Sequence, residues 1–98
     1  MVEHLVLFKF SETTTNEQKD AIIAQARQLK EAIPGIVDLK CGRNFSDRSK
    51  GFEVGLSVRF ENRQALEAYG PHPKHQELVA KLREIGMQET IVVDFPIE

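Results

Sequence analysis

Apolar side chains occupy both faces of the strand predicted at the beginning of the chain. Residues 2–10 alternate so that one face holds Val2, His4, Val6, Phe8 and Phe10, and the other holds Glu3, Leu5, Leu7 and Lys9. A strand with one wet face alternates apolar with polar residues, whereas this strand has two leucines on its second face. We therefore expect a central strand that is covered on two sides.

The remaining elements follow in the order helix, strand, strand, helix, strand. The predicted segments are a helix that starts at a Thr14–Glu17 capping box and ends at Pro34-Gly35, strands 36–41 and 52–60 with a polar loop 42–51 between them, a short helix 63–69, a helix from Pro73 to Gly86, and a last strand 89–95. This βαββαβ order predicts the α+β, ferredoxin-like fold, in which a four-stranded antiparallel sheet has its helices on one face.

The predicted fold leaves one face of the sheet without a helix. Leu5 and Leu7 lie on that face, beside Gly55, Ser57 and Arg59 of the strand 52–60. Burying one large aliphatic side chain contributes about 1.5–3 kcal/mol, so two exposed leucines on a central strand forfeit several kcal/mol. We predict a symmetric homodimer in which two sheets pack face to face and close into an α/β barrel.

Length and charge restrict the class of protein. With 98 residues the chain has the size of one domain, which we assign to residues 1–98. Thirteen Lys and Arg against 15 Asp and Glu provide no basic excess for nucleic acid. No apolar run is long enough to span a membrane, the first ten residues lack the long apolar core and cleavage site of a secretion signal, and Cys41 has no partner for an intrachain disulfide. We expect a cytoplasmic protein that binds neither nucleic acid nor membranes.

Three histidines and a tyrosine converge on one end of the predicted core. His4 shares a strand face with Val6 and Phe8, and His75 shares a helix stripe with Leu78, Leu82 and Ile85. Tyr69 and His72 come just before that helix. An imidazole with a pKa near 6.5 can exchange protons with a substrate at neutral pH. We predict a pocket that binds a small hydrophobic or carbonyl compound, with His75, Tyr69 and His4 as catalytic residues and His72, Val6, Phe8, Leu56 and Val58 as binding residues.

Two alternatives use the same residues. His72, His75 and His4 could supply three nitrogen ligands to a zinc ion, but Pro73 interrupts the pair and no carboxylate lies at ligand spacing. We therefore predict neither a metal site nor a cofactor. In the second alternative the protein has no catalytic activity and the histidines complete a hydrogen-bonded core. The protein then acts through the surface of the dimer.

Sequence elements along nearly the whole chain resemble the stress-responsive A/B barrel (Dabb) domain. They are His4-Leu-Val-Leu-Phe-Lys-Phe, Ile33-Pro-Gly-Ile, Gly42-Arg-Asn-Phe-Ser, Phe60-Glu, Tyr69-Gly-Pro-His72-Pro-Lys-His75 and the closing Val-Val-Asp-Phe at 92–95. The resemblance implies a dimeric barrel of ferredoxin-like subunits that is associated with stress responses.

A plant member of this family closes a linear polyketide by an intramolecular aldol reaction. By that resemblance His75 would be the general base, Tyr69 would hold the substrate or its oxyanion, His4 would orient the substrate, and His72 would support them. Any activity would then be cyclase-like, isomerase-like or lyase-like and would need no cofactor.

Overall fold

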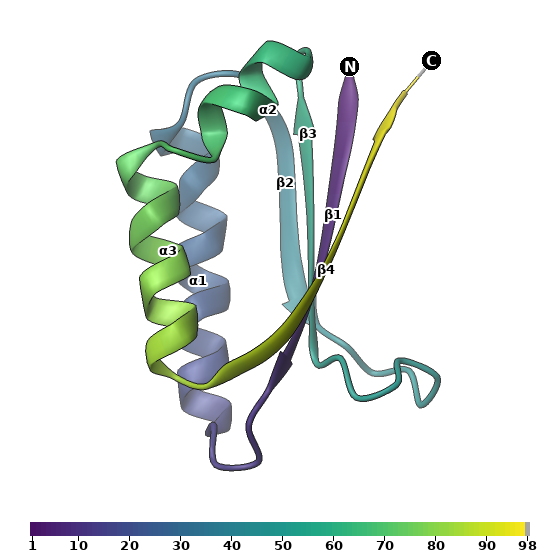
Figure 1. Ribbon diagram of the computed structural model, residues 1–98, viewed down its shortest axis with the longest axis vertical. Coiled ribbons are helices and arrows are strands. Elements are labelled where there is room, and N and C mark those ends of the chain that lie inside the picture. The colour runs from purple at the N-terminus through teal and green to yellow at the C-terminus, as the bar shows by residue number, and fades with distance from the viewer. Residues whose placement is uncertain (98) are drawn as a thin grey trace.

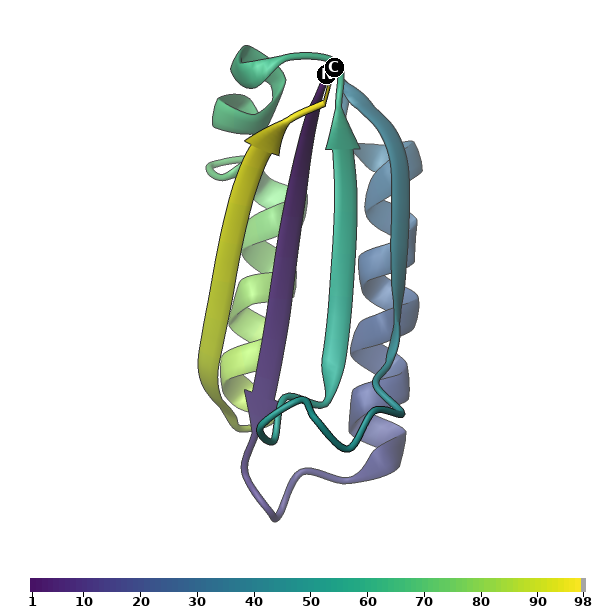
Figure 2. The same cartoon turned by 90° about the vertical axis from the view of Figure 1, so that its right-hand side faces the viewer.

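Seven helices and strands follow one another in the computed structural model, which describes residues 1–97 (Figure 1). They are β1 (Val2–Phe10), α1 (Asn16–Ala32), β2 (Ile36–Arg43), β3 (Val54–Phe60), α2 (Arg63–Tyr69), α3 (Pro73–Glu84) and β4 (Met87–Pro96). The four strands form one antiparallel sheet in the order β2-β3-β1-β4. The helices lie behind this sheet in the view of Figure 2. The architecture confirms the ferredoxin-like fold.

The alternating residues of the central strands divide between the two faces as predicted. Val6 and Phe8 of β1 and Leu56 and Val58 of β3 are buried against the helices. The strand ends differ by a few residues from the sequence pattern. β2 extends to Arg43, because that residue pairs with Val54 and its guanidinium bonds Asp20 of α1. β3 accordingly begins at Val54 rather than at residue 52.

α1 begins one residue later than the predicted capping box. Its N-cap is Thr15, whose hydroxyl accepts a hydrogen bond from the Gln18 backbone N–H at 3.1 Å, while the Gln18 side chain accepts one from the Thr15 N–H at 2.9 Å. Thr14 is buried instead and donates its hydroxyl to the Ile85 carbonyl at 2.5 Å. The predicted Thr14–Glu17 box is therefore wrong by one position, because Thr14 ties the start of α1 to the end of α3.

The chain between β3 and β4 forms two helices, as the sequence predicts. Asn62 caps α2 by accepting a bond from the Ala65 N–H at 2.9 Å, and α2 ends at Tyr69. Gly70 and Pro71 follow, and Pro73 occupies the first turn of α3, where its missing N–H costs nothing. This break places the last residue of α2 beside the first turn of α3.

The uncovered face of the sheet is more apolar than Leu5 and Leu7 alone predicted. Cross-strand pairing sets Val93 of β4 beside Leu5 and Ile91 beside Leu7, and Phe95 lies farther along the same face. Leu7, Ile91, Val93 and Phe95 are each 40–50% exposed.

No helix within residues 1–97 is long and apolar enough to cross a membrane.

Candidate functional site

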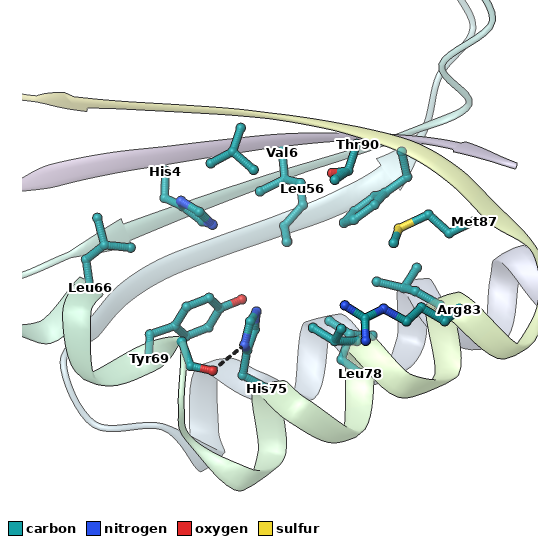
Figure 3. A pocket seen from close by; sticks show the side chains of 15 residues that line it. His4, Val6, Leu56, Leu66, Tyr69, His75, Leu78, Arg83, Met87 and Thr90 are labelled. Carbon is teal, nitrogen blue, oxygen red and sulfur yellow. Dashed lines mark hydrogen bonds between the residues drawn. The ribbon is translucent and has the colours of Figure 1, made fainter.

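A cavity of about 300 Å³ lies between the helices α2 and α3 and the strands β1 and β4 (Figure 3). That volume is at the lower end of the range for small-molecule sites. The lining residues are His4, Val6, Phe8, Leu56, Leu66, Tyr69, Gly70, His75, Leu78, Val79, Leu82, Arg83, Met87, Thr90 and Val92. Thr90 and Val92 are exposed, so the cavity opens to solvent along β4.

The cavity brings together most of the residues that the sequence singled out. His4, Tyr69, His75, Val6, Phe8 and Leu56 line it. His72 and Val58 lie outside the lining. His72 is the N-cap of α3, where its Nδ1 accepts a hydrogen bond from the Lys74 N–H at 3.1 Å. Val58 is fully buried in the core and pairs with His4 across the sheet.

His75 has one ring nitrogen bound and the other free. Its Nδ1 lies 2.9 Å from the Gly70 carbonyl oxygen. A carbonyl only accepts hydrogen bonds, so Nδ1 holds the proton and Nε2 is left as an acceptor. Burial lowers the pKa of His75, while the bond to Gly70 opposes that shift and the charges of His4 and His72 add to it. The ring is therefore neutral at pH 7 and can accept a proton.

Tyr69 places a hydroxyl without a partner in the same cavity. The residue is 2% exposed. Its hydroxyl oxygen is buried and has no hydrogen-bond partner within residues 1–97. Its ring centroid lies 4.3 Å from that of His75 and 5.8 Å from that of His4. Burial raises the pKa of Tyr69 to about 12, so the hydroxyl keeps its proton at physiological pH.

Asp94 is a site residue that sequence reasoning missed. It pairs with His4 across β1 and β4, and its Oδ1 lies 2.5 Å from His4 Nδ1. This contact fixes the imidazole plane and leaves Nε2 of His4 available to the cavity, toward which the ring points in Figure 3. The signal in the sequence was weak, because only the register of β4 against β1 places Asp94 beside His4.

Leu66 and Arg83 also line the cavity, although the sequence did not mark them as site residues. Cys41 lies elsewhere, on β2, and burial raises the pKa of its thiol to about 11. Within residues 1–97 no group of three His, Cys, Asp or Glu side chains is arranged to hold a metal ion. The cavity is thus an apolar chamber with two imidazoles, a phenol and a guanidinium.

The amino-acid sequence is similar to proteins of bacteria and plants. It is 30% identical over 88 residues to the uncharacterized protein SCO4036 of Streptomyces coelicolor, covering 88% of this chain and 91% of that protein. It is 29% identical over 76 residues to olivetolic acid cyclase of Cannabis sativa, covering 76% of this chain and 75% of the cyclase.

Solved structures have the same fold. A dimeric ferredoxin-like protein of unknown function from Thermobifida fusca superposes with a TM-score of 0.86 at 21% identity, covering 98% of this chain and 90% of that one. The family model described as Stress responsive A/B Barrel Domain matches residues 2–97. The predicted resemblance is thereby confirmed, and the chain belongs to the stress responsive A/B barrel (Dabb) domain family.

Proposed function

We propose that the cavity binds a small apolar carbonyl compound and catalyses proton transfer at the carbon next to the carbonyl. The observation that supports this most is the buried hydroxyl of Tyr69, which has no hydrogen-bond partner within residues 1–97 and belongs to a ring whose centroid lies 4.3 Å from that of His75. Leaving a buried hydroxyl unpaired costs about 1–3 kcal/mol, and a carbonyl oxygen of a ligand would remove that cost.

His75 has the properties of the base in this reaction. It is neutral at pH 7, its tautomer is fixed by Gly70, and its acceptor nitrogen is left for the cavity. The C–H bond next to the carbonyl breaks, the proton moves to Nε2 of His75, and the electron pair moves onto the carbonyl oxygen as an enolate. Delivery of that proton to another carbon or to the opposite face completes an isomerisation. In an aldol closure the enolate carbon bonds to a second carbonyl carbon, and the alkoxide that forms takes the proton from Nε2 of His75.

Tyr69 has the properties of the group that stabilises the enolate oxygen. Its high pKa keeps the proton on the phenol, so the hydroxyl donates a hydrogen bond that strengthens as negative charge develops on the oxygen. His4, held by Asp94, presents a second imidazole nitrogen that can orient the substrate. The similarity of the chain to a protein named as a cyclase supports an enzymatic role for the cavity.

Deuterium exchange at the α-carbon of a small ketone such as 2-heptanone tests the proposal. The wild-type protein is expected to accelerate exchange in D2O, and His75→Gln is expected to reduce the protein-dependent rate by about a hundredfold or more, the usual effect of removing a general base. Tyr69→Phe, which removes only the hydroxyl, is expected to lower the rate while the ketone still binds.

His72→Asn is the matched control, because His72 lies outside the cavity lining and asparagine preserves a helix N-cap. Its exchange rate is expected to equal that of the wild type. If the wild type does not accelerate exchange, or if all three variants behave alike, the catalytic proposal fails. The histidines would then be core hydrogen-bonding residues of a protein without this activity.

We also propose that two copies of the chain associate through the uncovered face of the sheet. The face holds Leu5, Leu7, Ile91, Val93 and Phe95, and contiguous exposed apolar surface of this kind marks an interaction site. The description of the Thermobifida fusca protein as dimeric supports this arrangement.

Sedimentation equilibrium at micromolar concentration tests the association. The wild type is expected to have twice the mass of the chain, whereas Val93→Glu, which puts a charge among these apolar side chains, is expected to be monomeric. Ala24→Glu, at an exposed position of α1 on the helix side of the sheet, is the control and is expected to stay dimeric. A monomeric wild type would contradict the proposal.

A further inference from the structure

One side chain with a permanent charge lines the cavity, and it is Arg83 near the end of α3. No aspartate or glutamate is among the lining residues that the structure describes. Arg83 is an exposed residue at the cavity, and its guanidinium has no counter-charge of its own among the lining residues.

Arg83 differs in this respect from the lysines of the same helix. Lys74 lies 3.5 Å from a carboxylate oxygen of Glu77, and Lys81 lies 3.5 Å from one of Glu84. Within residues 1–97, Arg83 has neither a carboxylate within 4 Å nor a side-chain hydrogen bond. The acidic residues of α3 therefore pair with its lysines, and the five N–H donors of Arg83 stay available.

Arg83 and His75 are attached near opposite ends of α3. Arg83 follows His75 by eight residues, so the helical rise of 1.5 Å per residue separates their Cα atoms by about 12 Å along α3. Figure 3 shows Val6 and Leu56 along the cavity between the end at His4 and the end at Met87 and Thr90. The cavity thus has a polar end with two imidazoles and a phenol, an apolar middle and one cationic side chain.

From this arrangement we infer that the natural ligand is a linear aliphatic oxo-carboxylate. Its carbonyl hydrogen-bonds Tyr69 beside His75, its methylene chain contacts Val6, Leu56 and Leu78, and its carboxylate pairs with Arg83. A planar guanidinium matches a carboxylate with two parallel N–H···O bonds. The inference rests on the proposed function, because it assumes that a carbonyl occupies the end with Tyr69.

A structural role for Arg83 makes a different prediction. Cations in the last turn of a helix stabilise it against the partial negative charge of the helix end, and Arg83 and Lys81 both lie there. If Arg83 did only this, Arg83→Gln would lower the stability of the protein and leave ligand preference unchanged.

Calorimetric titration with 7-oxooctanoate and with its methyl ester tests the inference. The two probes share the ketone and the chain and differ in the charge at the other end. Wild-type protein is expected to bind the carboxylate about three- to tenfold more tightly than the ester, which is the range for a charge-assisted pair that stays partly solvated. Raising the salt concentration is expected to reduce that preference.

Arg83→Gln is expected to bind the two probes equally, with its affinity for the ester unchanged. Arg63→Gln is the matched control, because Arg63 is an exposed arginine that does not line the cavity, and this variant is expected to keep the wild-type preference. Equal affinity of the wild type for both probes, or a preference that survives in Arg83→Gln, overturns the role of Arg83 while leaving the proposed function intact. Failure of both probes to bind the wild type overturns the proposed function and this inference together.

Discussion

The two halves of the chain have the same arrangement of helix on sheet and differ in whether a cavity lies between the helices and the strands. In the closed half, formed by α1, β2 and β3, the helix packs directly on the sheet through Ile22, Ile23, Ala26 and Leu29. Arg27 of α1 donates two hydrogen bonds to the Cys41 carbonyl of β2, at 3.1 and 2.8 Å, and holds helix and strand together. In the open half, formed by α2, α3, β1 and β4, the same layer contains the cavity.

The helices of the two halves account for the difference. α1 has 17 residues without interruption, whereas the break at Gly70 and Pro71 leaves α3 with only 12. The helix-side residues Thr90 and Val92 of β4 therefore remain exposed, although β4 pairs with β1 along almost its whole length. The comparison indicates that the divided helical segment leaves room for a site, whereas the uninterrupted helix α1 packs directly on its strands.

Replacing one leucine in each half by alanine is expected to produce the largest difference between the halves, measured as the loss in free energy of unfolding. Leu29→Ala, in the packed interface of the closed half, is expected to lower the free energy of unfolding by about 3 kcal/mol. Leu66→Ala, in the half-buried wall of the cavity, is expected to cost about 1 kcal/mol, because part of its surface already faces open space. Urea denaturation measures both, and equal losses would contradict the division into halves.

The next largest difference is expected between the labelling rates of a thiol in the closed half and a thiol at the cavity mouth. Burial raises the pKa of Cys41 from about 9 to about 11, which lowers the thiolate fraction near pH 8 about a hundredfold. A cysteine at the cavity mouth, made by Val92→Cys in a Cys41→Ala background, is expected to react at least a hundred times faster with iodoacetamide. A native Cys41 that reacts as fast as the introduced thiol would show that the closed half opens readily.

The smallest of these effects is the pH dependence of stability. Burial lowers the pKa of folded His75 below the value of about 6.5 in the unfolded chain, so the unfolded chain binds more protons in the interval between the two. Stability is therefore expected to fall as pH falls through about 6.5, and to stop falling once folded His75 is protonated. His75→Gln is expected to flatten this part of the pH profile in urea denaturation, whereas His72→Asn is expected to retain it. A profile that is the same in His75→Gln and the wild type would argue against a buried neutral His75.

Local patterns in the sequence were sufficient for the elements and for most of the cavity. The alternation in β1 and β3, the helix stripe of α3 and the Gly70-Pro71 break are short-range signals, and they placed His4, Tyr69 and His75 on one side of the sheet. Asp94 depends on the register between β4 and β1, which no short window of sequence determines.

The roles of two further residues could not be predicted from sequence patterns. His72 was grouped with the pocket because it lies three residues before His75, but its ring caps α3, a role set by the local backbone at the start of that helix. The sequence analysis did not single out Arg83, and only the folded structure shows that it lines the cavity while the lysines of α3 pair with glutamates. Side-chain direction and tertiary neighbours decided both cases.

Methyl-resolved NMR during titration with 2-heptanone tests most directly the claim that the open half alone receives a small molecule. The account predicts that methyl signals shift for lining residues of the open half and stay in place for core residues of the closed half. The first group is Val6, Leu66, Leu78 and Val92, and the second is Ile22, Leu29 and Leu39. Shifts spread equally over both groups, or no shift in either at saturating ketone, would contradict it.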